Sequence, residues 1–346
     1  MIKPERLKKG DKVAIVSLSR GMLGEKWAIH KLDIAKKRLE EDFGLEVVVM
    51  PNALKGIDYL YKHPEARAKD LMDAFKDKSI KAIFNAIGGD DTIRILPYID
   101  FEVIKNNPKI FTGFSDTTSN HFMMQKAGLI SYYGASVMNN FAEYVEINEY
   151  TKQALIDILF EPKDRLEIKP SSFYSTDEDK IWWKEENINL PTPRFKNEDG
   201  NIFLQGKSTI EGTLIGGCID VMISLNGTSL WPAENEWKDK ILLLEMSEAN
   251  ISPIVVGDLL RNFMTQGILK NINGIIIGRP AVKDYAEEYK EVIKNIVSFE
   301  ASRPDMPIIY NVNVGHAYPI HLLPLGERYQ IDCDKKTLTL LEKATS

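Results

Sequence analysis

The first 165 residues alternate short apolar runs with longer amphipathic segments, and this alternation restricts the fold more than any other feature of the chain. Buried strands are expected at residues 12–18, 45–50, 80–86 and 109–114, and helices at 26–42, 64–76, 92–99 and 116–127. Alternation of this kind implies parallel strands covered by helices on both faces. Residues 1–165 are therefore predicted to form a flavodoxin-like or Rossmann-like open parallel sheet, with its reactive loops at the carboxyl ends of the strands.

The pattern breaks over residues 166–205, a stretch rich in Ser, Asp, Glu, Asn and Pro. We expect a crossover linker loop here, since long connections are usually functional or disordered. Trp182 and Trp183 lie in its middle and either anchor the loop against the body or form a platform for a ligand. Strand and helix patterns resume over residues 206–346, which are predicted to form a smaller mixed α/β domain.

Composition excludes several classes of partner. The net charge of −6 gives no reason to expect a nucleic-acid polymer, and no apolar run approaches the length of a membrane span. The five histidines are dispersed without metal-ligand spacing, so no metal is predicted. Two cysteines fit a reducing cytoplasm. Residues 85–91, NAIGGDD, lack a dinucleotide or phosphate-loop fingerprint, and no cofactor is expected.

Ser115 is the candidate nucleophile. In the segment KIFTGFSD, residues 109–116, an apolar strand ends near Gly113 and a helix is expected to begin near Asp116. A serine on such a sharp strand-to-helix turn presents its hydroxyl out of the sheet, as in a nucleophile elbow, although GFSDT is not the GxSxG form of that motif. The alternative for Ser115 is simple capping of the helix.

A serine nucleophile needs a base, and the base needs an orienting carboxylate. His316 follows the expected strand at residues 307–312, at a strand end that faces the predicted crevice. Glu245 ends the apolar run KILLLE and is the expected orienting group, while Glu248, three residues on, remains an alternative.

The loop after the third expected strand carries two adjacent glycines, Gly88 and Gly89. Glycines let the backbone approach a substrate closely, and the N–H groups of Gly89 or Asp90, together with that of Asp116, are candidates for an oxyanion hole. A tight turn that caps the next helix is the alternative for this loop. Gly88, Trp182, Trp183 and Glu248 are the candidate substrate-binding residues, with the alternatives above still open for the tryptophans and for Glu248.

Six motifs follow one another in a specific order along nearly the whole chain. They are IGGDDTIRILPYIDF at 87–101, TGFSDTT at 112–118, EGTLIGGCIDVM at 211–222, ILLLEMSE at 241–248, IIIGRP at 275–280 and NVGHAYPIHLLPLG at 313–326. Together they resemble the serine LD-carboxypeptidase family, which includes murein tetrapeptide carboxypeptidases and microcin C immunity peptidases. The resemblance implies a Ser–Glu–His triad on Ser115, Glu245 and His316, a cytosolic location and a homodimer.

Two departures from the family pattern are visible. Cys218 stands where the family often has Asn, and residues 88–91 read GGDD where the murein enzymes typically have GGYG. With its long Trp-bearing crossover, the chain looks closer to the microcin-immunity branch, in which an aromatic residue of the crossover stacks on the nucleobase. Trp182 or Trp183 is the candidate for that contact.

The sequence thus predicts a serine peptidase of carboxypeptidase type that cleaves an amide through an acyl-enzyme. The expected substrate is a small peptidyl- or aminoacyl-nucleotide of the microcin C kind, and the alternative within this class is a murein tetrapeptide. A non-catalytic α/β protein that binds a small ligand is the alternative from another class.

Overall fold

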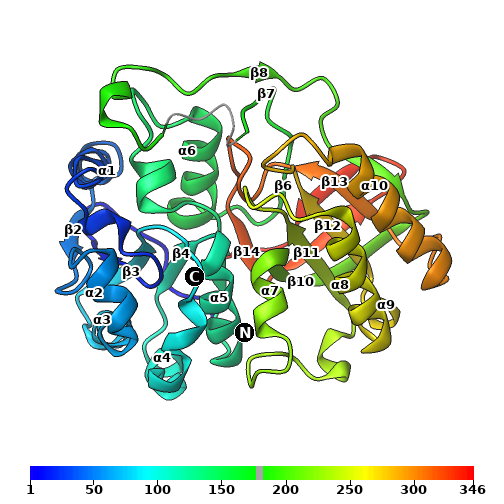
Figure 1. Ribbon diagram of the computed structural model, residues 1–346, viewed down its shortest axis with the longest axis horizontal. Helices are drawn as coiled ribbons and strands as arrows, with labels where there is room; N and C mark the ends of the chain where they lie inside the picture. The colour runs from blue at the N-terminus through cyan, green and yellow to red at the C-terminus, as the bar shows by residue number, and fades with distance from the viewer. Residues whose placement is uncertain (177–181) are drawn as a thin grey trace.

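A computed structural model describes residues 1–176 and 182–346 of the chain. Two β-sheets with their covering helices lie side by side, the N-terminal one on the left of Figure 1 and the C-terminal one on the right. The crossover segment passes along the top of both. The predicted α/β fold class is confirmed.

The first sheet follows the predicted open parallel pattern. Its six strands, in spatial order, are β14 (Leu323–Leu325), β5 (Ser131–Tyr133), β4 (Ile110–Gly113), β3 (Ile80–Asn85), β1 (Lys12–Val16) and β2 (Glu46–Val49). All neighbours pair in parallel except β14, which pairs antiparallel with β5. Since strands β1, β3, β4 and β5 run in parallel, their carboxyl ends gather at one edge, where the candidate site lies.

The second sheet is mixed and has eight strands. In order they are β6 (Leu166–Glu167), β16 (Thr337–Leu340), β15 (Arg328–Asp332), β10 (Thr209–Cys218), β11 (Lys240–Glu245), β12 (Gly274–Gly278), β13 (Ile308–Val312) and β9 (Ile202–Gln205). Strands β10 to β13 are parallel, and β15 and β9 flank them in antiparallel pairing. Continuous apolar runs such as KILLLE suit this arrangement, because central parallel strands are buried on both faces.

Ten α-helices cover the sheets in the described part of the chain. They are α1 (His30–Glu41), α2 (Ile57–Lys62), α3 (Pro64–Lys76), α4 (Phe101–Asn106), α5 (Thr118–Lys126), α6 (Glu149–Leu155), α7 (Ile219–Leu225), α8 (Pro253–Thr265), α9 (Ile268–Asn271) and α10 (Ala286–Asn295). Helices α5 and α7 face each other at the centre of the molecule (Figure 1). None of the described helices has the length and apolarity that crossing a membrane requires.

The segment predicted as a linker loop, residues 166–205, contains more structure than expected. Strands β6 and β9 join the second sheet, and β7 (Phe173–Tyr174) pairs with β8 (Phe195–Lys196) in a separate two-stranded ribbon. The exchange also runs the other way, since strand β14 comes from the C-terminal half of the chain yet pairs at the edge of the first sheet. The chain therefore ties its two halves together at several points.

Candidate active site

Ser115 lies on a sharp turn between β4 and α5. Its φ of 64° is in the left-handed region, which costs a non-glycine residue free energy. A short 3-10 turn, Ser115–Thr117, leads directly into α5. The serine is only partly buried and borders a cavity. This strained turn has the geometry expected of a nucleophile elbow.

His316 and Glu245 meet across the second half of the chain. The His316 Nδ1 lies 2.8 Å from Glu245 Oε2, and both side chains are buried. Glu245 ends β11, while His316 lies in the loop between β13 and β14. Gly315 makes the contact possible: its φ is 87°, and a Cβ there would lie 2.5 Å from Glu245 Oε2. The acceptor at Nδ1 fixes the imidazole tautomer that leaves Nε2 directed away from Glu245.

Glu248 contacts the other ring nitrogen of the same histidine. Its Oε2 lies 3.2 Å from His316 Nε2, and its side chain is 63% exposed. The two glutamates that the sequence left as alternatives therefore hold opposite sides of one imidazole. Glu245 is the buried partner in the position of an orienting carboxylate.

Tyr133, at the end of β5, links these groups, and the sequence did not single it out. Its hydroxyl donates to Glu245 Oε1 at 2.6 Å and accepts the backbone N–H of Ser115 at 3.1 Å. Burial, followed by the charge of Glu245, raises the pKa of Tyr133 well above its ordinary value. The hydroxyl thus keeps its proton and remains a donor to the carboxylate.

The loop with the two glycines approaches the nucleophile closely. A Cβ on Gly88 would lie 2.7 Å from Ser115 Cβ, 2.8 Å from its Oγ and 3.2 Å from the backbone N of Asp116. The buried carboxylate of Asp116 accepts the Thr92 N–H at 2.8 Å and the hydroxyl of Ser19, so it ties this loop to the turn. The Asp116 side chain is thereby structural, while its backbone N remains beside Ser115.

Asp90 points elsewhere. Its carboxylate is exposed and lies 3.6 Å from the guanidinium of Arg20. Only its backbone could serve the site in the way the sequence analysis expected.

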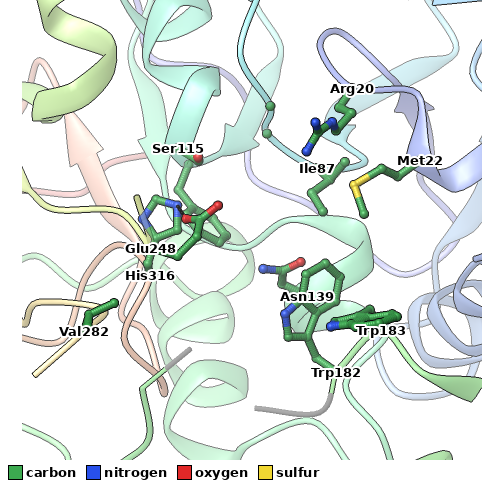
Figure 2. A pocket seen from close by; sticks show the side chains of 13 residues that line it. Arg20, Met22, Ile87, Ser115, Asn139, Trp182, Trp183, Glu248, Val282 and His316 are labelled. Carbon is green, nitrogen blue, oxygen red and sulfur yellow. Dashed lines mark ion pairs between the residues drawn. The ribbon is translucent and has the colours of Figure 1, made fainter. Parts of the chain in front are cut away.

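A cavity of about 540 Å³ brings most of the predicted site residues together. Its lining includes Gly88, Gly89, Ser115, Trp182, Trp183, Glu248 and His316. Figure 2 shows Ser115, His316 and Glu248 on one side, with Trp182 and Trp183 on the opposite side and Asn139 between them. Arg20 and Met22 form a further wall, and neither was predicted from the sequence.

The two tryptophans are positioned differently. Trp183 is 45% exposed, with its ring edge-to-face with Trp27 at 6.4 Å. Trp182 is half-buried, and the ammonium of Lys31 lies 5.8 Å from its ring centre. Burial lowers the pKa of Lys31 to about 7.

Two other histidines that lie near the site in sequence are structural. His121 bonds to Ser131 and to the Gly113 carbonyl, and His321 donates to the Leu322 carbonyl. Burial lowers the pKa of both to about 4, so they are neutral at physiological pH.

Cys218 ends β10 directly behind the His316–Glu245 pair. Its backbone N–H donates to Thr118 Oγ1 at 2.9 Å, a bond that does not involve the Cys218 side chain. Ligand atoms of Cys218, Glu245 and His316 lie within 4.8 Å of one another, a spacing that could hold a metal ion. Glu245 already bonds to both His316 and Tyr133, and an ion there would have to displace these contacts. The absence of a metal stays a prediction.

Comparison with known proteins identifies the family. Residues 13–134 match the LD-carboxypeptidase N-terminal domain, and residues 211–331 match the LD-carboxypeptidase C-terminal domain. The chain therefore belongs to the LD-carboxypeptidase family, peptidase family S66. This result confirms the resemblance seen in the sequence and makes the chain a serine peptidase, which argues against a non-catalytic binding protein.

Particular relatives are similar over most of their length. YocD of Bacillus subtilis, named as a carboxypeptidase, is 30% identical over 94% of this chain and 95% of its own. The microcin C7 self-immunity protein MccF of Escherichia coli is 27% identical over 81% of this chain and 79% of its own. An MccF-like protein from Streptococcus pneumoniae, solved in complex with AMP, is 33% identical, with a TM-score of 0.87 over 96% of this chain and 98% of that one.

Proposed function

We propose that this protein hydrolyses an amide or acyl bond of a peptidyl- or aminoacyl-nucleotide through a triad of Ser115, His316 and Glu245. One observation carries the proposal: the candidate nucleophile and base share a single cavity with two tryptophans. A nucleobase can stack on an aromatic side chain of the protein, whereas a murein tetrapeptide has no aromatic ring that would stack there.

The mechanism follows from the hydrogen bonds at His316. Glu245 accepts the Nδ1 proton, so Nε2 can take the proton of the Ser115 hydroxyl as Oγ attacks the substrate carbonyl. His316 then returns this proton to the leaving nitrogen as the C–N bond breaks. Water, activated by the same imidazole, hydrolyses the acyl-enzyme and regenerates the serine.

The developing oxyanion would lie between the glycine loop and the serine turn. Backbone N–H groups of Gly89 or Asp90 and of Asp116 are the proposed donors, and each such donor is worth about 3 kcal/mol in the transition state. The contacts of Gly88 with Ser115, and of Asp116 with Thr92, support this assignment because they hold the two backbone segments side by side.

The nucleotide would extend from Ser115 across the cavity toward the tryptophans. The Streptococcus pneumoniae protein was solved with AMP, and the Escherichia coli relative is named for immunity to microcin C7. Arg20 borders the cavity between the two ends, and its guanidinium suits a phosphate group there. Cleavage of the acyl group from the nucleotide would detoxify an antibiotic of this type.

Hydrolysis of a murein tetrapeptide is the second candidate, favoured by the name of the family whose domains the chain contains. The two functions are separated by a paired assay with an aminoacyl-nucleotide amide and an L,D-linked tetrapeptide. We expect hydrolysis of the nucleotide substrate by the wild type and none by Ser115→Ala. Cleavage of the tetrapeptide alone would reject the nucleotide proposal, and turnover by Ser115→Ala would reject the nucleophile.

A second serine variant checks that loss of turnover is chemical. Ser115→Gly removes the hydroxyl and also the cost of φ 64°, about 1 kcal/mol. It should be as inactive as Ser115→Ala but no less stable in urea unfolding.

The family resemblance also leads us to propose a cytoplasmic location and a homodimer. Light scattering on the purified protein tests the homodimer.

A further inference from the structure

Glu248 lines the cavity with a carboxyl group that the triad does not need. It lies in the loop between β11 and α8, and its carboxylate is 3.2 Å from His316 Nε2. That nitrogen is the one that must accept the proton of Ser115. The other nitrogen already has its carboxylate, Glu245. A carboxylate can accept from Nε2 only when that nitrogen carries a proton, so Glu248 here occupies the position that the Ser115 hydroxyl must take on an unprotonated Nε2.

The loop that carries Glu248 is anchored on both sides of it. The Ser247 N–H donates to Asp220 Oδ2 at 3.1 Å, and the Ala249 N–H donates to Ser247 Oγ at 3.1 Å. The Glu248 side chain itself is 63% exposed. Its carboxylate can thus rotate away from His316 while the backbone stays in place.

The charges around the cavity are distributed unevenly. Among the described residues that line it, the ionisable side chains are Arg20, Glu248 and His316. Arg20 borders the cavity away from the His316 imidazole (Figure 2), and its guanidinium lies 3.6 Å from the Asp90 carboxylate. On the Ser115 side, the accessible fixed charge of these lining residues is the carboxylate of Glu248. A second carboxylate there would be repelled, and an ammonium group would be attracted.

We propose that Glu248 selects substrates whose acyl part carries a protonated amine near the scissile carbonyl. This inference rests on the proposed function and specifies its substrate class. The amine forms a charge-assisted hydrogen bond with Glu248 and draws the carboxylate away from His316 Nε2. Binding of the correct acyl group therefore both positions the substrate and uncovers the base, so discrimination appears in kcat as well as in KM.

Two parts of an acyl group could supply the amine: the free α-amino group of an aminoacyl residue, or a basic side chain. Lysyl, norleucyl and glutamyl amides of one nucleotide, each with a free and an acetylated α-amino group, separate these sources. A rate advantage of lysyl over norleucyl assigns the side chain. A loss of rate on acetylation of the norleucyl compound assigns the α-amino group.

The test compares the wild type with Glu248→Gln and Glu248→Lys. In the wild type, we expect kcat/KM for the amine-bearing compound to exceed that of its neutral counterpart by about tenfold or more. Glu248→Gln should remove most of this preference, and Glu248→Lys should reverse it in favour of the glutamyl compound. Glu291→Gln, a change of an exposed glutamate on α10, is the matched control and should keep the wild-type preference.

The experiment distinguishes an error in the role of Glu248 from an error in the proposed function. If kcat/KM of the wild type is the same for the lysyl, norleucyl and glutamyl compounds and is also unchanged by acetylation of the α-amino group, the selection by Glu248 is overturned while nucleotide hydrolysis stays intact. If only tetrapeptides are cleaved, the nucleotide proposal fails, and the same lysine–norleucine pair is compared in the peptide. Calorimetric affinities of Ser115→Ala for the lysyl, norleucyl and acetyl-norleucyl compounds give a readout without turnover, and equal values for all three would also overturn the inference.

Discussion

The Tyr133 hydroxyl lies 2.6 Å from Glu245 Oε1 and so connects the last residue of β5 to the last residue of β11, one in each sheet. The same oxygen accepts the Ser115 N–H. One buried hydroxyl therefore fixes the distance between the turn that carries the proposed nucleophile and the carboxylate that holds the proposed base. Tyr133 thus holds Ser115, from the first sheet, and the Glu245–His316 pair, from the second, in a fixed relative position.

Removal of this hydroxyl should reduce turnover without much effect on substrate binding. In Tyr133→Phe, Glu245 loses a donor and the Ser115 N–H loses its acceptor, so we expect kcat to fall about tenfold or more and stability to fall by about 1–2 kcal/mol. Tyr132→Phe on the same strand loses a buried bond to the Ala344 carbonyl and is the matched control. It should lose similar stability but keep kcat. Full kcat in folded Tyr133→Phe would contradict the linking role.

Gly88→Ala tests the close approach of the glycine loop. The new Cβ would lie under 3 Å from Ser115 Cβ and Oγ, so the loop or the serine must move. A displacement of about 1 Å at a reacting group costs about 100-fold in rate, and we expect a loss of kcat/KM of that order. Gly128→Ala, where no heavy atom lies within 4 Å of the new Cβ, introduces only the strain of its φ of 79°. Its activity should remain, and comparable inactivation of both variants would reject a specific role for Gly88.

Trp183 is the better candidate for nucleobase stacking because it is 45% exposed, while Trp182 is half-buried. Trp183→Ala should weaken AMP binding by about tenfold to 100-fold, the usual range for loss of one base–aromatic stack. Phe173→Ala removes an equally exposed aromatic side chain of the crossover that does not line the cavity, and should bind AMP normally. Calorimetric titration measures both. Unchanged affinity in Trp183→Ala, with a loss in Trp182→Ala, would transfer the role to Trp182.

Strand ends made much of the site predictable from the sequence. Ser115, Glu245 and His316 each follow a continuous apolar run, and parallel strands bring such positions to one edge. Tyr133 was not predictable in this way. It is the last residue of the short strand Ser131–Tyr133, whose aromatic residues have the pattern of ordinary core, and its polar contacts come from residues 18 and 112 positions away.

Whether Glu245 or Glu248 orients His316 could also not be predicted without the three-dimensional structure. Glu245 ends β11 and Glu248 lies three residues on in the following loop, and which one meets Nδ1 depends on the left-handed turn at Gly315 that directs His316. Strands β6 and β14 were not predicted from the sequence, because segments of two and three residues are too short to show the alternating apolar pattern of a strand. Strand β9, Ile202–Gln205, lies in a polar segment and is recognisable only through its pairing with β13.

Glu327, which does not line the cavity, is expected to make the stability of the fold depend on pH. Its side chain is 2% exposed and lies 3.2 Å from the Lys3 ammonium. Burial raises the pKa of Glu327 to about 7, against the opposing effect of Lys3. The unfolded chain ionises this carboxyl near its ordinary pKa of 4.5. The stability linked to Glu327 is therefore fully present below pH 4.5 and is lost as the pH rises to about 7.

Glu327→Gln removes the charge and keeps the shape of the side chain. The variant should match the wild type at pH 5 and exceed its free energy of unfolding by about 2 kcal/mol at pH 8. Urea unfolding at the two pH values measures the difference. Glu46→Gln, at an exposed carboxylate that pairs with Lys12, controls for a general effect of charge and should show no such change between pH 5 and pH 8. A Glu327→Gln variant less stable than the wild type at pH 8 would mean that the ion pair with Lys3 outweighs the cost of burial.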